Sequence, residues 1–289
     1  MMRFISALLA YVVLLAPCAM AQGTEKITIS GVEVEWNGYT VIEPESNVDI
    51  STAKLSDFTA APFSPQYPVT VDTYLLEEGK LTETTVFHVH SDKPGPTVYI
   101  VAGVHGDERA AWYAGILLRT ATISSGDLYI LAPANANGAR RISRYVTGQQ
   151  DLNRSFPGDK AGNEAERLAH AIFNDIDRVK PDLVFDLHEA LIYAPDRRDF
   201  LGSTYIFTIL DGIEDLFFDL LFATQDGTVC HNEFGYNGPG PSGSINAEVS
   251  NRLGIPAITV ETFRGFPMDR RVSDQLDSVR FALEYLGMR

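Results

Sequence analysis

The chain has 289 residues and a formal net charge of −15 at pH 7. This length suits one large domain, or one domain with a small appendage. The acidic balance would repel phosphate backbones, so we expect no nucleic-acid partner.

The first 21 residues have the pattern of a secretory signal peptide. Arg3 provides a short positive region, and residues 5–16 are apolar but too few to span a bilayer comfortably. Residues 19–21 read Ala-Met-Ala, an A-x-A cleavage pattern. We therefore predict cleavage near Ala21 and a secreted or periplasmic chain with no membrane attachment afterwards. Cys230 would then be the one remaining cysteine, which excludes an intramolecular disulfide and suits a bacterial periplasm or exterior.

Residues 22–82 differ in texture from the rest of the chain. Apolar and polar residues alternate over 26–42 (KITISGVEVEWNGYTVI), which predicts a small hairpin or edge strands. Two prolines at 64–69 (SPQYPV) favour an irregular connection. We predict a signal peptide over 1–21, a small N-terminal β-rich appendage over 22–82 and a catalytic domain over 83–289. An inhibitory role for the appendage is an alternative, although no processing site is evident.

From residue 83 onward, short apolar strands alternate with helical periods. The predicted strands are TTVFHVH (84–90), TVYIVAGV (97–104), DLYILAPA (127–134), DLVFDLHEA (182–190), TYIFTIL (204–210) and AITVET (257–262). The predicted helices span 107–121, 163–178, 213–225, 246–253 and 269–287. Continuous apolar strands covered by helices indicate an α/β fold with a largely parallel sheet buried on both faces. Ligands bind such sheets at the carboxyl ends of the strands.

Three side chains suited to a metal or to acid–base chemistry stand at such strand ends. His105 and Glu108, in GVHGDE, are three residues apart at a strand-to-helix turn and could converge on one point. His188, in FDLHEA, ends another strand and supplies a third ligand. Two histidines and one carboxylate form a zinc site that keeps a position open for water, whose pKa zinc lowers to about 7. A helix N-terminus with acids in its first turn is the plainer alternative for Glu108.

The other histidines fit structural positions better. His88 and His90 share one face of a strand and resemble a solvent-facing or edge pair. His170 lies in a polar helix, and His231 follows Cys230 without a ligand pattern.

Residues 134–158 (ANANGARRISRYVTGQQDLNRSFPG) form an arginine-rich loop in an acidic protein. Arginines near a metal favour an anionic substrate or a developing oxyanion, because a guanidinium pairs bidentately with a carboxylate. Ordinary surface ion pairs are the alternative for Arg140 and Arg141.

Four motifs in this order, HGDE, DLNRSFPG, DLHEA and TVET, resemble the zinc carboxypeptidase superfamily, and most closely its succinylglutamate desuccinylase/aspartoacylase branch. They span roughly residues 95–265. The resemblance implies a three-layer α/β/α sandwich around a mixed, largely parallel eight-stranded sheet, with one Zn²⁺ per chain. This branch carries a C-terminal β domain after its catalytic glutamate, whereas only 28 residues follow Glu261 here.

The resemblance also implies a role for each matching residue. His105, Glu108 and His188 match the zinc ligands. Asn153 and Arg154 match the pair that holds the free carboxylate of the substrate. The remaining matches are catalytic: Arg144 to the arginine that polarises the scissile carbonyl, Glu261 to the general base and acid, and Tyr236, loosely, to a mobile tyrosine, with Tyr193 and Tyr205 as alternatives.

These features predict an exported zinc metallohydrolase of the carboxypeptidase type, which cleaves an amide bond next to a free carboxylate in a peptide or cell-wall peptide. A deacylase of N-acyl amino acids needs the same core residues and is the first alternative. An inactive relative that binds peptide or glycan is the second. The same ligand set also occurs in non-haem iron oxygenases, but the α/β pattern and Glu261 argue against that chemistry.

Overall fold

The computed structural model describes residues 24–29, 32–36, 42–44, 52–58, 63, 66–190, 202–209, 211–231 and 234–289. The predicted signal peptide, residues 1–21, lies outside these ranges. Among the described residues, no helix combines the length and apolar character needed to cross a membrane.

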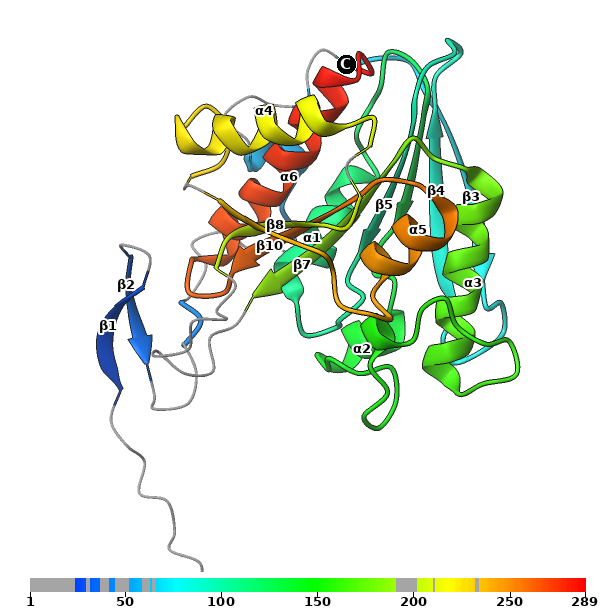
Figure 1. The fold of residues 1–289 in the computed structure, drawn as a ribbon, viewed down its shortest axis with the longest axis horizontal. Helices are drawn as coiled ribbons and strands as arrows, with labels where there is room; N and C mark the ends of the chain where they lie inside the picture. Colours follow the sequence, from blue (N-terminus) through cyan, green and yellow to red (C-terminus); the bar gives the residue numbers. More distant parts are fainter. Residues whose placement is uncertain are drawn as a thin grey trace, which may run out of the picture.

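Eight strands form one mixed sheet in the order β3-β4-β6-β5-β7-β10-β8-β9 (Figure 1). The strands are β3 (Thr70–Leu76), β4 (Thr84–His90), β5 (Thr97–Ala102), β6 (Asp127–Leu131), β7 (Leu183–Ala190), β8 (Thr204–Phe207), β9 (Gly235–Asn237) and β10 (Ala257–Phe263). The central run β6-β5-β7-β10 is parallel, and so is the pair β8-β9. The three remaining pairs, β3-β4, β4-β6 and β10-β8, are antiparallel.

Helices cover both faces of this sheet. The helices are α1 (Arg109–Leu118), α2 (Ala136–Arg141), α3 (Glu164–Val179), α4 (Glu214–Gln225), α5 (Ile245–Leu253) and α6 (Met268–Tyr285). Helices α1, α4 and α6 bury their apolar side chains in one core cluster, whereas α3 and α5 contribute to a second cluster on the opposite face. The predicted three-layer α/β fold is thus confirmed.

The amino-terminal part of the chain contributes to both sheets. β1 (Glu25–Ile29) and β2 (Val32–Trp36) form an antiparallel hairpin, the expected product of the alternating pattern. Figure 1 shows this hairpin beside the main body of the molecule. Further along, the short 3₁₀ helix Leu55–Asp57 and Phe63 lie against the main core, and β3 pairs along β4 in the large sheet.

Side-chain alternation decides which face of the sheet carries chemistry. Along β7, Phe185 and Leu187 point to the cluster with α1 and α6, so Asp186 and His188 point to the face of α3 and α5. In the parallel pair of β7 and β10, Glu261 stands directly opposite His188. The two side chains therefore emerge on one face, at the carboxyl ends of neighbouring strands.

Candidate metal centre and active site

The loop that follows β5 is shaped by two glycines. Gly103 has a φ of +76°, and a Cβ on it would meet the side chain of Trp112 at 2.6 Å. A Cβ on Gly106 would lie 2.1 Å from the carbonyl carbon of Gly138, at the start of α2. Only glycine therefore lets this loop press against α2. The loop presents His105 and Glu108 immediately before α1 begins.

His105, Glu108 and His188 come together in the buried interior, as the sequence predicts. The Glu108 carboxylate lies between the two rings: its Oε1 is 2.6 Å from Nδ1 of His105, and its Oε2 is 2.7 Å from Nδ1 of His188. The backbone N–H of Glu189 also donates to Oε2 of Glu108, at 3.0 Å. All three ligand side chains are about 5 % exposed or less.

The outer nitrogen of each ring faces an aspartate, which the sequence analysis did not include. Nε2 of His105 is 3.1 Å from Oδ1 of Asp151, and Nε2 of His188 is 3.0 Å from Oδ1 of Asp186. A ligand histidine commonly has a carboxylate on its second nitrogen, which fixes the ring and its tautomer. Asp186 stands two residues before His188, so strand alternation alone could have placed it on the same face.

Charge strongly perturbs the pKa of these groups. Burial alone would lower the pKa of both histidines, but the neighbouring carboxylates, Glu108 first for His105 and Asp186 first for His188, outweigh it and raise both. Burial would raise the pKa of Glu108, yet the two histidines hold it well below its usual range. The carboxylates around the two histidines therefore favour positive charge in this pocket.

These residues fit a divalent metal of the zinc type. The donor set is two imidazoles and one carboxylate whose ligand atoms lie within 4.8 Å of one another, all of them buried. Both inner nitrogens point to one carboxylate, and both outer nitrogens face carboxylates that would orient them.

Glu261 lies beside this centre. It lies opposite His188 in the strand register and keeps a partly exposed side chain. Desolvation by its surroundings, opposed by the charge of His188 and aided by that of Glu108, raises the pKa of Glu261 to about 7. A bound cation would lower this pKa again, because positive charge favours the carboxylate.

Arg144 reaches the same centre from the loop after α2. Its Nε and Nη2 donate to Oδ2 of Asp151 at 3.1 and 3.0 Å, and its Nη1 is 3.6 Å from Oε1 of Glu108. The Arg144 side chain is 32 % exposed, so the guanidinium lies between the buried ligand residues and the solvent.

Asn153 and Arg154, the two residues predicted to hold the substrate carboxylate, make different contacts beside the centre. The Asn153 side chain is buried: its Nδ2 is 3.4 Å from Nε2 of His188, and its Oδ1 accepts from the N–H of Ile245 at the start of α5. Arg154 is exposed, and its Nη1 donates to the carbonyl of Asn153.

The two tyrosine candidates that the structure describes, Tyr236 and Tyr205, do not reach the ligand residues. Tyr236 is 62 % exposed on the edge strand β9, beside Phe207. Its strand is two positions from β10, about 10 Å across the sheet. Tyr205 is buried and bonds to Ser278 of α6 on the other face. Tyr193 lies outside the described residues, so Tyr236 stays a prediction.

The structure also contains an ion-pair network that the sequence analysis did not predict. The network lies next to the loop that carries His105 and Glu108. Glu189 accepts from the N–H of Ala110 in the first turn of α1, and its other oxygen pairs with Arg271 of α6. Arg271 also lies 3.1 Å from Glu43. Glu43 in turn pairs with Arg264, which lies 3.2 Å from Asp107 in the ligand loop. The described segment 42–44 is thereby joined to the loop that carries His105 and Glu108.

The chain has a zinc carboxypeptidase-like α/β fold. Residues 94–194 match the model of the succinylglutamate desuccinylase/aspartoacylase catalytic domain, which confirms the resemblance predicted from the motifs and supports a hydrolase role. No curated protein sequence matches the chain.

Solved structures of the same fold include a succinylglutamate desuccinylase from Silicibacter sp. TM1040, with 17 % identity over 78 % of this chain and 72 % of that one, and a TM-score of 0.57. An aspartoacylase family protein from Mesorhizobium loti shows 20 % identity over 79 % and 70 % of the two chains, with a TM-score of 0.58. The cell shape determinant Csd4 of Helicobacter pylori, described as a D,L-carboxypeptidase in its mDAP-bound form, shows 18 % identity. Its apo structure matches over 76 % of this chain but only 55 % of that one, with a TM-score of 0.60.

Proposed function

We propose that the chain is an exported, zinc-dependent hydrolase that cleaves an amide bond next to a free carboxylate in a peptide or cell-wall peptide. The observation that carries this proposal is the convergence of His105, Glu108 and His188 on one buried point with Glu261 on the adjacent strand end. Export rests on the signal-peptide pattern of residues 1–21.

The residues of the chain have separate tasks in this scheme. His105, Glu108 and His188 hold the zinc, which would supply an acidified water and polarise the carbonyl. Glu261 accepts a proton from the attacking water and later gives it to the leaving amine.

Substrate binding falls to Arg144, Arg154 and Asn153. Arg144 offers a guanidinium to the developing oxyanion, which such donors commonly stabilise by a few kcal/mol. Arg154 is exposed, and its guanidinium is available to hold the carboxylate of the substrate beside Asn153. An anchored carboxylate fixes which amide bond meets the base.

The family match gives a second candidate. Residues 94–194 match the catalytic domain of desuccinylases and aspartoacylases, which favours release of an amino acid from an N-acyl amino acid. The same residues would serve, because this substrate also carries a free carboxylate next to its amide.

The test combines metal content with product release. The purified chain should contain one zinc at the centre of His105, Glu108 and His188, and it should release amino acids from one class in a panel of peptides, cell-wall peptides and N-acyl amino acids. Glu261→Gln is the matched variant, since it keeps the shape of the side chain and removes its basicity. Full turnover by Glu261→Gln would contradict the mechanism, and absence of any release after zinc is added would favour a binding protein.

A further inference from the structure

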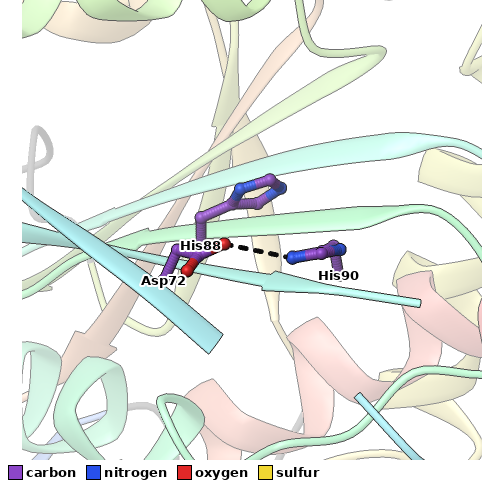
Figure 2. A group of neighbouring side chains, drawn as sticks. All are labelled: Asp72, His88 and His90. Atoms are coloured by element: carbon purple, nitrogen blue, oxygen red, sulfur yellow. Dashed lines mark hydrogen bonds and ion pairs between the residues drawn. The ribbon is translucent and has the colours of Figure 1, made fainter. Parts of the chain in front are cut away.

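A second cluster of metal-ligating side chains lies on the edge of the sheet, away from the active site. It consists of Asp72 on β3 with His88 and His90 on β4 (Figure 2). One ring nitrogen of each histidine and one carboxylate oxygen of Asp72 lie within 4.8 Å of one another. β4 runs antiparallel to β6, so His90 stands beside Asp127 at the start of β6, whereas the active site lies at the other end of the parallel strands.

Strand geometry explains why these three side chains share a face. His88 and His90 are two residues apart on one strand, so both point the same way. Asp72 is the cross-strand partner of His88, where side chains come within about 5 Å. Figure 2 shows the Asp72 carboxylate and the His90 ring joined across the two strands, with 3.2 Å between Oδ2 and Nε2.

A fourth residue, Asp127 on β6, prepares His88 as a ligand. Its Oδ1 lies 2.6 Å from Nε2 of His88, which leaves Nδ1 of that ring for a metal. The ring also stacks on Tyr129, with centroids 4.1 Å apart and planes 7° apart, so its plane is held. A carboxylate on the outer nitrogen of a ligand histidine is the arrangement that orients metal-binding imidazoles.

We propose that Asp72, His88 and His90 bind a second divalent transition-metal ion of the zinc type, with Asp127 as the positioning residue. Two imidazoles and one carboxylate suit Zn²⁺ or a neighbouring transition metal and not Ca²⁺ or Mg²⁺, which take oxygen ligands. Ligand atoms around tetrahedral zinc are about 3.3 Å apart, so the cluster needs rotations that close at most about 1.5 Å.

The adjustment falls to Asp72 and His90, because the plane of the His88 ring is held, and the cluster has access to solvent. His88 and His90 are 21 % and 30 % exposed, and Asp72 is 69 % exposed. The two aspartates also provide negative charge for a dication. A bound ion would cross-link the edge strand β3, which pairs only with β4 among the described strands, to the rest of the sheet.

Metal stoichiometry tests this site separately from the active site. The chelator-treated full chain is dialysed against micromolar Zn²⁺ and its bound zinc is counted. We expect two equivalents for the wild type, one for His90→Ala and one for His188→Ala. His170→Ala, which removes a histidine of α3 that bonds to Asn174, is the matched control and should keep two. Asp72→Asn provides a second, exposed substitution if His90→Ala folds poorly.

Ring ¹⁵N chemical shifts of the histidines, measured in the His188→Ala variant, identify which histidines bind the second metal. Zn²⁺ should shift His88 and His90 and leave His170 unchanged, and Asp127→Asn should weaken this second binding about 10–100-fold. Two equivalents of zinc retained by His90→Ala, or ring shifts that require millimolar Zn²⁺, would overturn the proposal. Two equivalents of zinc retained by His188→Ala would instead contradict the proposed active site.

Discussion

Replacing Arg271 by methionine tests how the active-site scaffold is held. Arg271 is fully buried on α6, and its guanidinium pairs with the Glu189 carboxylate, whose side chain is also fully buried. Methionine fills much of the same volume but leaves the buried Glu189 carboxylate without its ion-pair partner. Arg271 also pairs with Glu43, which is 30 % exposed and keeps its second partner, Arg264. Loss of the pair between Arg271 and Glu43 should therefore change stability little.

The expected cost follows from the burial of Glu189. Breaking a buried ion pair from one side costs about 3–5 kcal/mol, a large share of a typical unfolding free energy of about 5–15 kcal/mol. A chain of this size loses roughly 2–4 °C in Tm per kcal/mol, so Arg271→Met should melt about 10 °C lower. Urea and thermal unfolding followed by circular dichroism measure both quantities.

A second substitution separates buried charge from lost packing. In Arg271→Met with Glu189→Gln the carboxylate charge is gone, while the amide oxygen can still accept from Ala110, so at least half of the lost stability should return. Arg252→Met, which removes an exposed partner of Glu248 on α5, is the control and should change stability by less than about 0.5 kcal/mol. A loss below about 1 kcal/mol for Arg271→Met, or no recovery in the double variant, would refute this account of the network.

Two further predictions concern chemistry and pH. Glu261→Gln should lower kcat by at least about 100-fold with zinc content and melting temperature retained, as measured by turnover, metal analysis and thermal unfolding; an unchanged kcat would rule out Glu261 as the base. His231 has its pKa raised, first by its hydrogen bond to the buried Asp274, so its stabilising effect should be complete below pH 6.5 and vanish as the pH rises through the raised value. The unfolding free energies of wild type and His231→Gln should therefore differ most in mild acid and converge at higher pH, and a gap that grows with pH would contradict this assignment.

Strand ends explain why the ligands could be predicted from sequence. The apolar runs before His105, His188 and Glu261 predict buried strands. Parallel strands bring their carboxyl ends to one edge of the sheet. Glu108 follows from its spacing after His105. Local pattern and sheet physics therefore bring the three candidate ligands and Glu261 to one edge, whereas the role of Glu261 as base comes from the resemblance to the family.

Pairings between distant segments could not be predicted in the same way. Glu43 and Arg264 lie 221 residues apart in sequence, and an exposed or a buried arginine looks the same in a local pattern. The cluster of Asp72, His88 and His90 was missed for a related reason. The histidine pair was visible on one strand, but its carboxylate comes from the antiparallel neighbour, and that register depends on how β3 joins the sheet.

The two aspartates behind the ligand histidines should have separable effects. Asp151 and Asp186 each face the outer nitrogen of one ligand ring, so Asp151→Asn and Asp186→Asn should both weaken zinc binding about 10–100-fold. Asp151 also holds the Arg144 guanidinium through two hydrogen bonds, whereas Asp186 has Thr259 as its other partner. At saturating zinc, Asp186→Asn should therefore regain nearly full kcat, while Asp151→Asn should stay slow because Arg144 has lost its anchor. Zinc titration and turnover at saturating metal measure the two effects. Equal recovery of both variants would show that Asp151 does not position Arg144 for catalysis.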